Sequence, residues 1–325
     1  MSATHAQVPG VMAVAGCGVI GSGWIARALA AGMQVRAWDP DPDAIRRLRA
    51  SIDTAWPALE RRGLAQGASR DRLHFTTDLD EALQGADLVQ ENAPERLEVK
   101  QSLLADIDAR VPEQVLIGSS TSGIKPSELQ AQCQKAPGRV IVAHPFNPVY
   151  LLPLVELVGG IHTDPTHMEA ASAQYAQLGM RPLIVRREIE GHIADRLMEA
   201  LWREALHLVN DGVATTEEVD AAIVYGAGLR WSLMGTFLTF HLAGGEGGMR
   251  HMLEQFGPAL KQPWTRLEAP ELTPDLIERV ASGSEFQAGG RSVAALEARR
   301  DRFLGELLEV VERYWPEHEG LGGRI

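Results

Sequence analysis

The most informative part of the chain is VMAVAGCGVIGSGWIARALAAGMQVRAWD, residues 11–39. Its pattern predicts an apolar strand over 11–15, a helix over 20–31 and a second strand over 34–38. The first strand leads into the helix through a Gly-x-Gly-x-x-Gly pattern at residues 16–21. Such glycines allow a tight turn and let a pyrophosphate approach the backbone, and the helix N-terminus supplies N–H donors for the anion.

Asp39 stands at the end of the second strand, 18 residues after Gly21. A carboxylate there accepts hydrogen bonds from ribose hydroxyls and repels a 2′-phosphate, which favours NAD over NADP. A glycine turn without a ligand is the alternative interpretation, and the combination of strand, helix and acidic residue disfavours it. We therefore predict NAD as the cofactor, bound by Gly16, Cys17, Gly18, Val19, Ile20, Gly21 and Asp39.

The first half of the chain continues to alternate short apolar runs with helical stretches. The further runs that we interpret as strands are Leu88–Gln90, Val115–Gly118 and Val140–Ala143. Continuous apolar strands alternating with helices are typical of a parallel sheet covered on both faces, the doubly wound α/β class. From about residue 191 the pattern changes to long amphipathic helices, starting with 193–210. We expect a Rossmann-type domain at 1–190, followed by an all-helical C-terminal domain at 191–325.

Composition excludes several classes of function. Among 325 residues there are 31 Lys and Arg against 43 Asp and Glu, a formal net charge of −12, which disfavours nucleic acid as a partner. No apolar run approaches the ~18–20 residues that a membrane span needs, and the N-terminus lacks the features of a secretory signal. Two cysteines cannot form a disulfide framework or a zinc knuckle. We expect a cytoplasmic protein without a bound metal.

Three polar features follow or interrupt the later apolar runs, and together they suggest alcohol oxidation. A run of hydroxyl residues, Ser119–Ser122, follows one strand, and because ligands bind at the carboxyl ends of parallel strands, Ser120 and its neighbours can face the nicotinamide. His144 follows the next strand, and Glu156 interrupts an apolar run.

Removal of a hydride from a secondary alcohol needs a base for the hydroxyl proton, and imidazole suits this task at neutral pH. A buried Glu156 can hold the second nitrogen of His144, and Ser122 can bond to the substrate oxygen. The alternatives are that His144 caps a turn and that Glu156 pairs with an arginine.

These motifs together resemble those of the 3-hydroxyacyl-CoA dehydrogenases. The likeness covers nearly the whole chain, roughly residues 12–248, and includes Pro94-Glu95 through Lys100, His144-Pro-Phe-Asn-Pro and Gly191–Leu197. It implies a Rossmann domain, a helical domain that forms a homodimer, and oxidation of a 3-hydroxyl with NAD. It also implies roles for individual residues: His144 as catalytic base, Glu156 as its partner, Ser122 as the hydroxyl contact, and Glu95 and Lys100 on the cofactor side.

Two departures from that family concern the substrate. Asp195 stands where the acyl-CoA enzymes carry an asparagine, and the stretch after the Ser51 helix lacks the lysines that they use near the coenzyme A phosphates. Within the family, residues 201–237 and 144–160 are most similar to a branch that oxidises the 3-hydroxyl of a small free acid with a trimethylammonium group, of which L-carnitine is the example. A sister branch, which acts on L-gulonate, differs around Phe146 and Trp231.

A quaternary ammonium has no N–H, so aromatic faces and carboxylates must recognise it. The aromatic candidates are Phe146 and Tyr150, which flank the histidine turn, and Trp231, which follows a glycine-rich turn. Asp195 supplies a negative charge. Arg230 could bind the substrate carboxylate in a bidentate manner. Tryptophans on amphipathic helices more often form core or dimer contacts, which is the interpretation we favour for Trp202 and Trp264.

The expected partner is thus a small, carnitine-like molecule. The alternatives are a sugar acid or a short acyl-CoA as substrate, or a non-catalytic NAD-binding protein.

Overall fold

The computed structural model describes residues 10–232, 235–244, 248–256, 262–266, 273–276, 278 and 293–314. Backbone contacts divide the chain into two compact units, of which the first ends at Asp195 and the second begins at Arg196. Within the described residues, no helix is both long enough and apolar enough to cross a bilayer.

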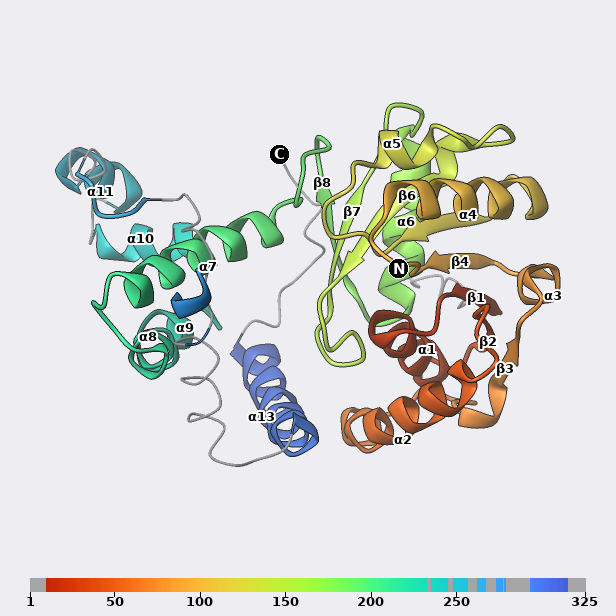
Figure 1. Cartoon of the computed structure of the whole chain (residues 1–325), viewed down its shortest axis with the longest axis horizontal. Coiled ribbons are helices and arrows are strands. Elements are labelled where there is room, and N and C mark those ends of the chain that lie inside the picture. Colours follow the sequence, from red (N-terminus) through yellow and green to blue (C-terminus); the bar gives the residue numbers. More distant parts are fainter. Residues whose placement is uncertain are drawn as a thin grey trace, which may run out of the picture. The chain divides into compact units, whose positions relative to one another are not determined.

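The first unit is built on one eight-stranded sheet with the order β3-β2-β1-β4-β5-β6-β7-β8 (Figure 1). The strands are β1 (Val11–Ala15), β2 (Gln34–Trp38), β3 (Leu73–Thr76), β4 (Leu88–Glu91), β5 (Leu116–Ser119), β6 (Val140–Pro145), β7 (Leu154–Val158) and β8 (Arg181–Val185). Because β1 lies between β2 and β4, the strand order reverses there. In open α/β sheets, ligands bind at such a switch point, outside the carboxyl ends of the strands.

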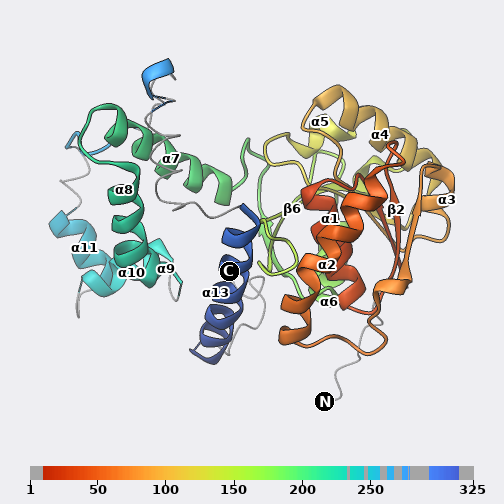
Figure 2. The same ribbon diagram turned by 60° about the horizontal axis from the view of Figure 1, so that its bottom comes forward.

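Helices cover both faces of this sheet (Figures 1 and 2). Met12 and Val14 of β1 lie in a core with α1 (Val19–Ala30), α2 (Ala44–Arg62) and α6 (Pro165–Gln177). Ala13 and Ala15 lie in a second core with α3 (Leu79–Leu83), α4 (Leu97–Arg110) and α5 (Pro126–Gln130). Short 3-10 turns, η1 (Arg70–Arg72) and η2 (Pro137–Arg139), precede β3 and β6. Alternate residues of one buried strand therefore serve two cores, and the prediction of a doubly wound α/β fold is confirmed.

The sheet is not parallel throughout, which corrects the sequence interpretation. β7 runs antiparallel to β6, whereas β8 runs parallel to β7. The eight residues 146–153 between β6 and β7 are too few for the crossover helix that a parallel neighbour requires, so the chain turns back. The sequence pattern also did not mark β3 and β8, which lie at the two edges of the sheet and are only partly buried.

The described part of the second unit is helical. Its helices are α7 (Ala194–Asn210), which starts at the end of the first unit, α8 (Thr216–Ala222), the π-helical turn η3 (Ile223–Ala227), α9 (Gly228–Trp231), α10 (Thr236–Ala243), α11 (Gly248–Phe256) and α13 (Val293–Tyr314). A capping box begins α8: Thr215 Oγ1 accepts from the N–H of Glu218 at 3.2 Å, and Glu218 Oε2 accepts from the N–H of Thr215 at 2.8 Å.

Several apolar side chains of α7 are exposed among the described residues, including Leu197, Leu201 and Trp202. An apolar groove of about 490 Å³ lies between α7 and α8–η3, and its lining includes Leu201, Trp202, Val209, Val219 and Ile223. Trp202 is 52% exposed and Trp264 is 75% exposed. Of the two roles considered for these tryptophans, a core contact is therefore wrong, and a dimer contact stays a prediction.

A buried ion pair anchors the start of β5 and β6 to α4. Arg139 and Asp108 are each about 1% exposed, and Nη2 of Arg139 lies 2.7 Å from Oδ1 of Asp108. The same guanidinium donates to the backbone oxygens of Asp108 and Val115. Burial alone raises the pKa of Asp108, but the hydrogen bonds from Arg139 and from two backbone amides outweigh it and lower the pKa.

We predict that Arg139→Met lowers the free energy of unfolding by about 3–5 kcal/mol, because it leaves the Asp108 carboxylate buried without its cation. Urea titration would measure the loss. Arg110→Met is the matched control, since Arg110 forms an exposed pair with Asp106, and we expect a loss below about 1 kcal/mol. Equal losses in the two variants would contradict the prediction.

Candidate active site

The glycine loop after β1 has the geometry that a dinucleotide requires. Gly16 has φ +96°, and a Cβ added to it would lie 2.7 Å from the backbone oxygen of Asn92. A Cβ on Gly21 would lie 1.9 Å from the backbone oxygen of Gly16, whereas one on Gly18 would meet nothing within 4 Å. Gly18 is the N-cap of α1 and no side chain caps this helix end. The first N–H groups of α1 are thus available to a pyrophosphate.

Asp39 lies beside this loop at the end of β2. Its Oδ2 accepts from the N–H of Cys17 at 2.9 Å, and its Oδ1 accepts from the N–H of Asp41 at 3.0 Å. These bonds orient the carboxylate at the position where a ribose is expected. Cys17 is buried, and its burial, with the nearby charge of Asp39, raises the pKa of the thiol to about 12. The residues present fit NAD, and the thiol of Cys17 stays protonated.

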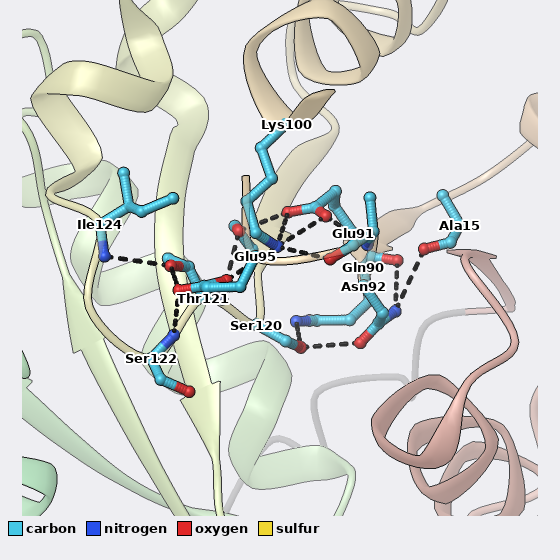
Figure 3. Close-up of polar contacts among 12 residues, drawn as sticks. Ala15, Gln90, Glu91, Asn92, Glu95, Lys100, Ser120, Thr121, Ser122 and Ile124 are labelled. Carbon is cyan, nitrogen blue, oxygen red and sulfur yellow. Dashed lines mark hydrogen bonds and ion pairs between the residues drawn. The ribbon is translucent and has the colours of Figure 1, made fainter. Parts of the chain in front are cut away.

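A second cluster of predicted residues joins the ends of β4 and β5 to α4 (Figure 3). Glu95 accepts from the N–H groups of Ser122 at 3.0 Å and Gly123 at 3.3 Å, and from the hydroxyl of Thr121. This carboxylate therefore holds the loop that carries Ser122, whose side chain is exposed.

Lys100 has a more buried position than its predicted role on the cofactor side suggests. Its ammonium lies 3.0 Å from Oε1 of Glu91, 3.0 Å from the backbone oxygen of Ala93 and 3.4 Å from Oε2 of Glu95 (Figure 3). Lys100 and Glu91 are 1% and 0% exposed. Since an ammonium has three protons and three partners surround it, Lys100 supports the segment after β4 rather than presenting a free charge.

Ser120 is the centre of a small polar network. Its hydroxyl accepts from Trp24 Nε1 at 3.0 Å and from Gln90 Nε2 at 2.8 Å, and it donates to Asn92 Oδ1 at 2.8 Å. Asn92 in turn donates to the backbone oxygens of Gln90 and Ala15 (Figure 3). Ser120, the first residue after β5, is thus linked through Asn92 to the ends of β4 and β1, at the edge where the cofactor is expected.

The structure brings His144 and Glu156 together. The two residues lie directly opposite each other in the antiparallel pair β6 and β7, and therefore on the same face of the sheet. Nδ1 of His144 lies 3.0 Å from Oε2 of Glu156, and the two side chains are 6% and 0% exposed. An ionised carboxylate only accepts, so Nδ1 carries the proton and Nε2 is the nitrogen left for a further partner.

Glu156 also binds the start of α7. Its Oε1 accepts from the N–H groups of Ile193 at 2.9 Å and Ala194 at 3.0 Å. Burial alone raises the pKa of Glu156, but the hydrogen bonds from His144, Ala194 and Ile193 outweigh it and hold the pKa below its ordinary value. The carboxylate is therefore ionised at neutral pH, where its charge also favours the positive end of the helix dipole.

Two of the predicted substrate residues lie beside His144. Oδ2 of Asp195, in the first turn of α7, is 3.6 Å from Nε2 of His144. The ring of Phe146 meets the ring of His144 edge-on, with 5.2 Å between the centroids. Arg230 and Trp231 are exposed on α9 in the second unit, and their contact with a substrate stays a prediction.

Sequence reasoning missed several residues of the site, among them Glu91 and His192. Glu91 is the second of two polar residues that end an apolar strand, which is a usable signal for a functional strand end. His192 separates Gly191 from an amphipathic helix and has no such signal, since a histidine there could equally cap the helix.

Fold and site together have the character of an NAD-dependent dehydrogenase. The family model "3-hydroxyacyl-CoA dehydrogenase, NAD binding domain" matches residues 11–189, and the model of the C-terminal domain of the same family matches residues 191–287. The chain therefore belongs to the 3-hydroxyacyl-CoA dehydrogenase family. The predictions of the family and of NAD as cofactor are confirmed.

The chain is also similar to individual named proteins over nearly its whole length. The L-carnitine dehydrogenase of Bacillus cereus is 62% identical over 303 residues, which are 93% of this chain and 93% of the relative. That of Pseudomonas putida is 60% identical and covers 94% of this chain and 95% of its own. Among solved structures, an NAD+-dependent dismutase, 5-formyl-3-hydroxy-2-methylpyridine 4-carboxylic acid 5-dehydrogenase, has a TM-score of 0.78 at 26% identity, covering 94% of this chain and 99% of that chain.

We predict that Asp39→Asn raises KM for NAD about 10- to 100-fold, the usual worth of a hydrogen bond to a charged group, and weakens the discrimination against NADP. Steady-state rates with both cofactors would measure this. Asp41→Asn is the control, because the Asp41 carboxylate pairs with Arg47 instead of the glycine loop. A wild-type KM in Asp39→Asn would refute the assignment of the ribose contact.

The lowered pKa of Glu156 predicts how the free energy of unfolding depends on pH in acid. Its pKa is lower in the folded protein than in the unfolded chain, so its contribution is present above the ordinary value of 4.5 and is lost as the pH falls through the folded value. The free energy of unfolding should therefore fall more steeply for wild type than for Glu156→Gln between about pH 6 and pH 3.5. Urea titrations of the wild type and of Glu156→Gln over this range test the prediction. Glu98→Gln, a change at an exposed glutamate, is the control and should behave as wild type. Parallel stability curves for the three proteins would contradict the prediction.

Proposed function

We propose that this protein oxidises the 3-hydroxyl of L-carnitine to give 3-dehydrocarnitine, with NAD as hydride acceptor. The observation that carries the proposal is the buried His144–Glu156 pair with the Asp195 carboxylate 3.6 Å from Nε2 of the histidine. Relatives named L-carnitine dehydrogenase that align over nearly the whole chain support this choice of substrate.

The reaction removes two hydrogens from one carbinol group. NAD supplies the acceptor for the hydride that leaves carbon 3. His144 Nε2 takes the hydroxyl proton as the carbonyl forms, and ionised Glu156 stabilises the imidazolium through the Nδ1–H bond. Ser122 is the proposed hydrogen-bond donor to the substrate oxygen. NADH and one proton, released later from His144, complete the balance.

Asp195 is the proposed counter-charge for the trimethylammonium group. In carnitine the ammonium nitrogen is separated from the hydroxyl oxygen by only two carbons, so a substrate whose hydroxyl binds at Nε2 of His144 brings its cation close to Asp195. Phe146, whose ring contacts the His144 ring, is the proposed aromatic neighbour of the same cation. A carboxylate in place of an amide also repels the phosphates of coenzyme A.

The cofactor residues are proposed on the same basis. Gly18 and the first N–H groups of α1 would bind the pyrophosphate, Asp39 would bind the ribose, and Glu95 and Ser120 would line the nicotinamide end. In this scheme Lys100 acts through Glu91 and Glu95 and touches no ligand.

The domain roles belong to the proposal as well. We infer an NAD-binding Rossmann domain over 1–190 and a helical domain over 191–325 that contributes Arg230 and Trp231 to the substrate and forms the subunit contact. The exposed apolar groove along α7 supports a homodimer, because a second copy would remove Trp202 and its neighbours from water. A cytoplasmic location suits an enzyme that consumes NAD.

Turnover of L-carnitine, L-gulonate and 3-hydroxybutyryl-CoA at equal concentration, followed as NADH absorbance, tests the substrate. We expect kcat/KM to be highest for L-carnitine. His144→Asn should abolish turnover while NADH binding, measured by fluorescence, survives. Oxidation of the acyl-CoA alone would overturn the argument from Asp195, and NADH binding without turnover of any substrate would indicate a non-catalytic protein.

The role of Asp195 has a sharper test in a neutral analogue. 3-Hydroxy-5,5-dimethylhexanoate replaces the ammonium nitrogen of carnitine by carbon and keeps its shape. Asp195→Asn should lower kcat/KM for L-carnitine about 10- to 100-fold, since a paired charge is lost, and should leave the neutral analogue unaffected or improved. Glu199→Gln, a charge change on the same helix, is the control. Equal losses with both substrates would show that Asp195 does not recognise the cation.

A further inference from the structure

His192 is a buried imidazole that none of the roles above uses. It is 0% exposed and directly precedes Ile193 and Ala194, whose N–H groups bind Glu156. Its φ of +46° lies in the left-handed region, and Gly191 before it has φ +70°. A residue with a large side chain keeps such a conformation only where its surroundings hold it in place. The surroundings of the turn into α7 therefore hold this ring in a defined position.

One nitrogen of His192 has a defined partner. Nε2 lies 3.3 Å from the backbone oxygen of Thr121, and Thr121 is itself fully buried. A carbonyl only accepts, so Nε2 carries the proton and Nδ1 carries the lone pair. A buried carbonyl needs a donor, and an apolar ring of the same size could not supply one. Thr121 directly precedes Ser122, the residue proposed to bond to the substrate oxygen.

The ring of His192 also packs against the catalytic base. The centroids of His192 and His144 are 5.4 Å apart, with 53° between the planes. Nδ1 of His192 has no hydrogen-bond partner among the described residues, so a second proton there would be a buried donor without an acceptor. Burial and the neighbouring His144 lower the pKa of His192, while the Thr121 carbonyl, Glu156 and Asp195 oppose this. The ring is neutral beside a base that gains positive charge.

We propose that His192 is a positioning residue: its neutral ring ties the Ser122 loop, through the Thr121 carbonyl, to the His144–Glu156 pair. One side chain then contacts His144 by ring packing and, by a hydrogen bond, the residue that directly precedes Ser122. The inference rests on the proposed function, since it concerns the geometry around that same hydroxyl.

The test compares two replacements of His192. Phenylalanine keeps a planar ring against His144 but lacks the donor, and glutamine places its Nε2 the same number of bonds from Cβ as the imidazole Nε2. His192→Phe should lower kcat on the order of 10²-fold, the effect of a small misplacement of reacting groups, while KM for NAD stays unchanged. His192→Gln should restore kcat to within about fivefold of wild type, since one neutral donor replaces another.

The rates are divided by the concentration of folded enzyme, which NADH binding measures, so that unfolding of a variant is not mistaken for a lower kcat. His207→Phe replaces another buried histidine of the chain, distant in sequence from Thr121, and should keep wild-type kcat. Wild-type kcat in His192→Phe, or an equal loss in folded His192→Gln, would overturn the inference. If wild type prefers another 3-hydroxy acid, the same ratios are measured with that substrate, which separates failure of this inference from failure of the proposed function.

Discussion

The arrangement of the site depends on one buried carboxylate, that of Glu156. Its two oxygens bind in two directions, Oε2 to the imidazole of His144 and Oε1 to the first N–H groups of α7. A buried charge is costly unless it is paired and hydrogen-bonded, and here three donors satisfy it. Because these donors come from β6 and from the start of α7, a single side chain fixes His144, which is the proposed base, and the start of the helix that carries Asp195.

The antiparallel strand makes this arrangement possible. In a wholly parallel sheet, neighbouring strands are joined by long crossovers. The short return from β6 to β7 places Glu156 directly opposite His144, so that the proposed base and its partner lie in one hydrogen-bonded ladder. Their separation is then set by the backbone of the sheet and not by flexible loops, which is the rigidity that proton transfer needs.

The sequence predicted what local spacing determines and missed what strand register and burial determine. The glycine loop and Asp39 are recognisable because strand, turn and helix follow each other within 29 residues, 11–39. His144 is recognisable as a polar residue at the end of an apolar run, and Glu156 as a polar residue that interrupts one. The pairing of Lys100 with Glu91, and the contact of His192 with Thr121 across 71 positions of the chain, arise only from tertiary structure. The edge strands β3 and β8 were missed because each is only partly buried, which weakens the apolar signal.

The charge balance of the site explains how one scaffold could select a cation. Around His144 lie two carboxylates, Glu156 and Asp195, and the Glu91 and Glu95 carboxylates share the single ammonium of Lys100. An ammonium substrate and the positively charged oxidised nicotinamide both suit these carboxylates, whereas the phosphates of an acyl-CoA do not. At position 195 the resemblance to the acyl-CoA enzymes implies an asparagine. Exchange of its amide nitrogen for oxygen changes the charge with little change in shape, so substrate class can change while the His–Glu machinery stays the same.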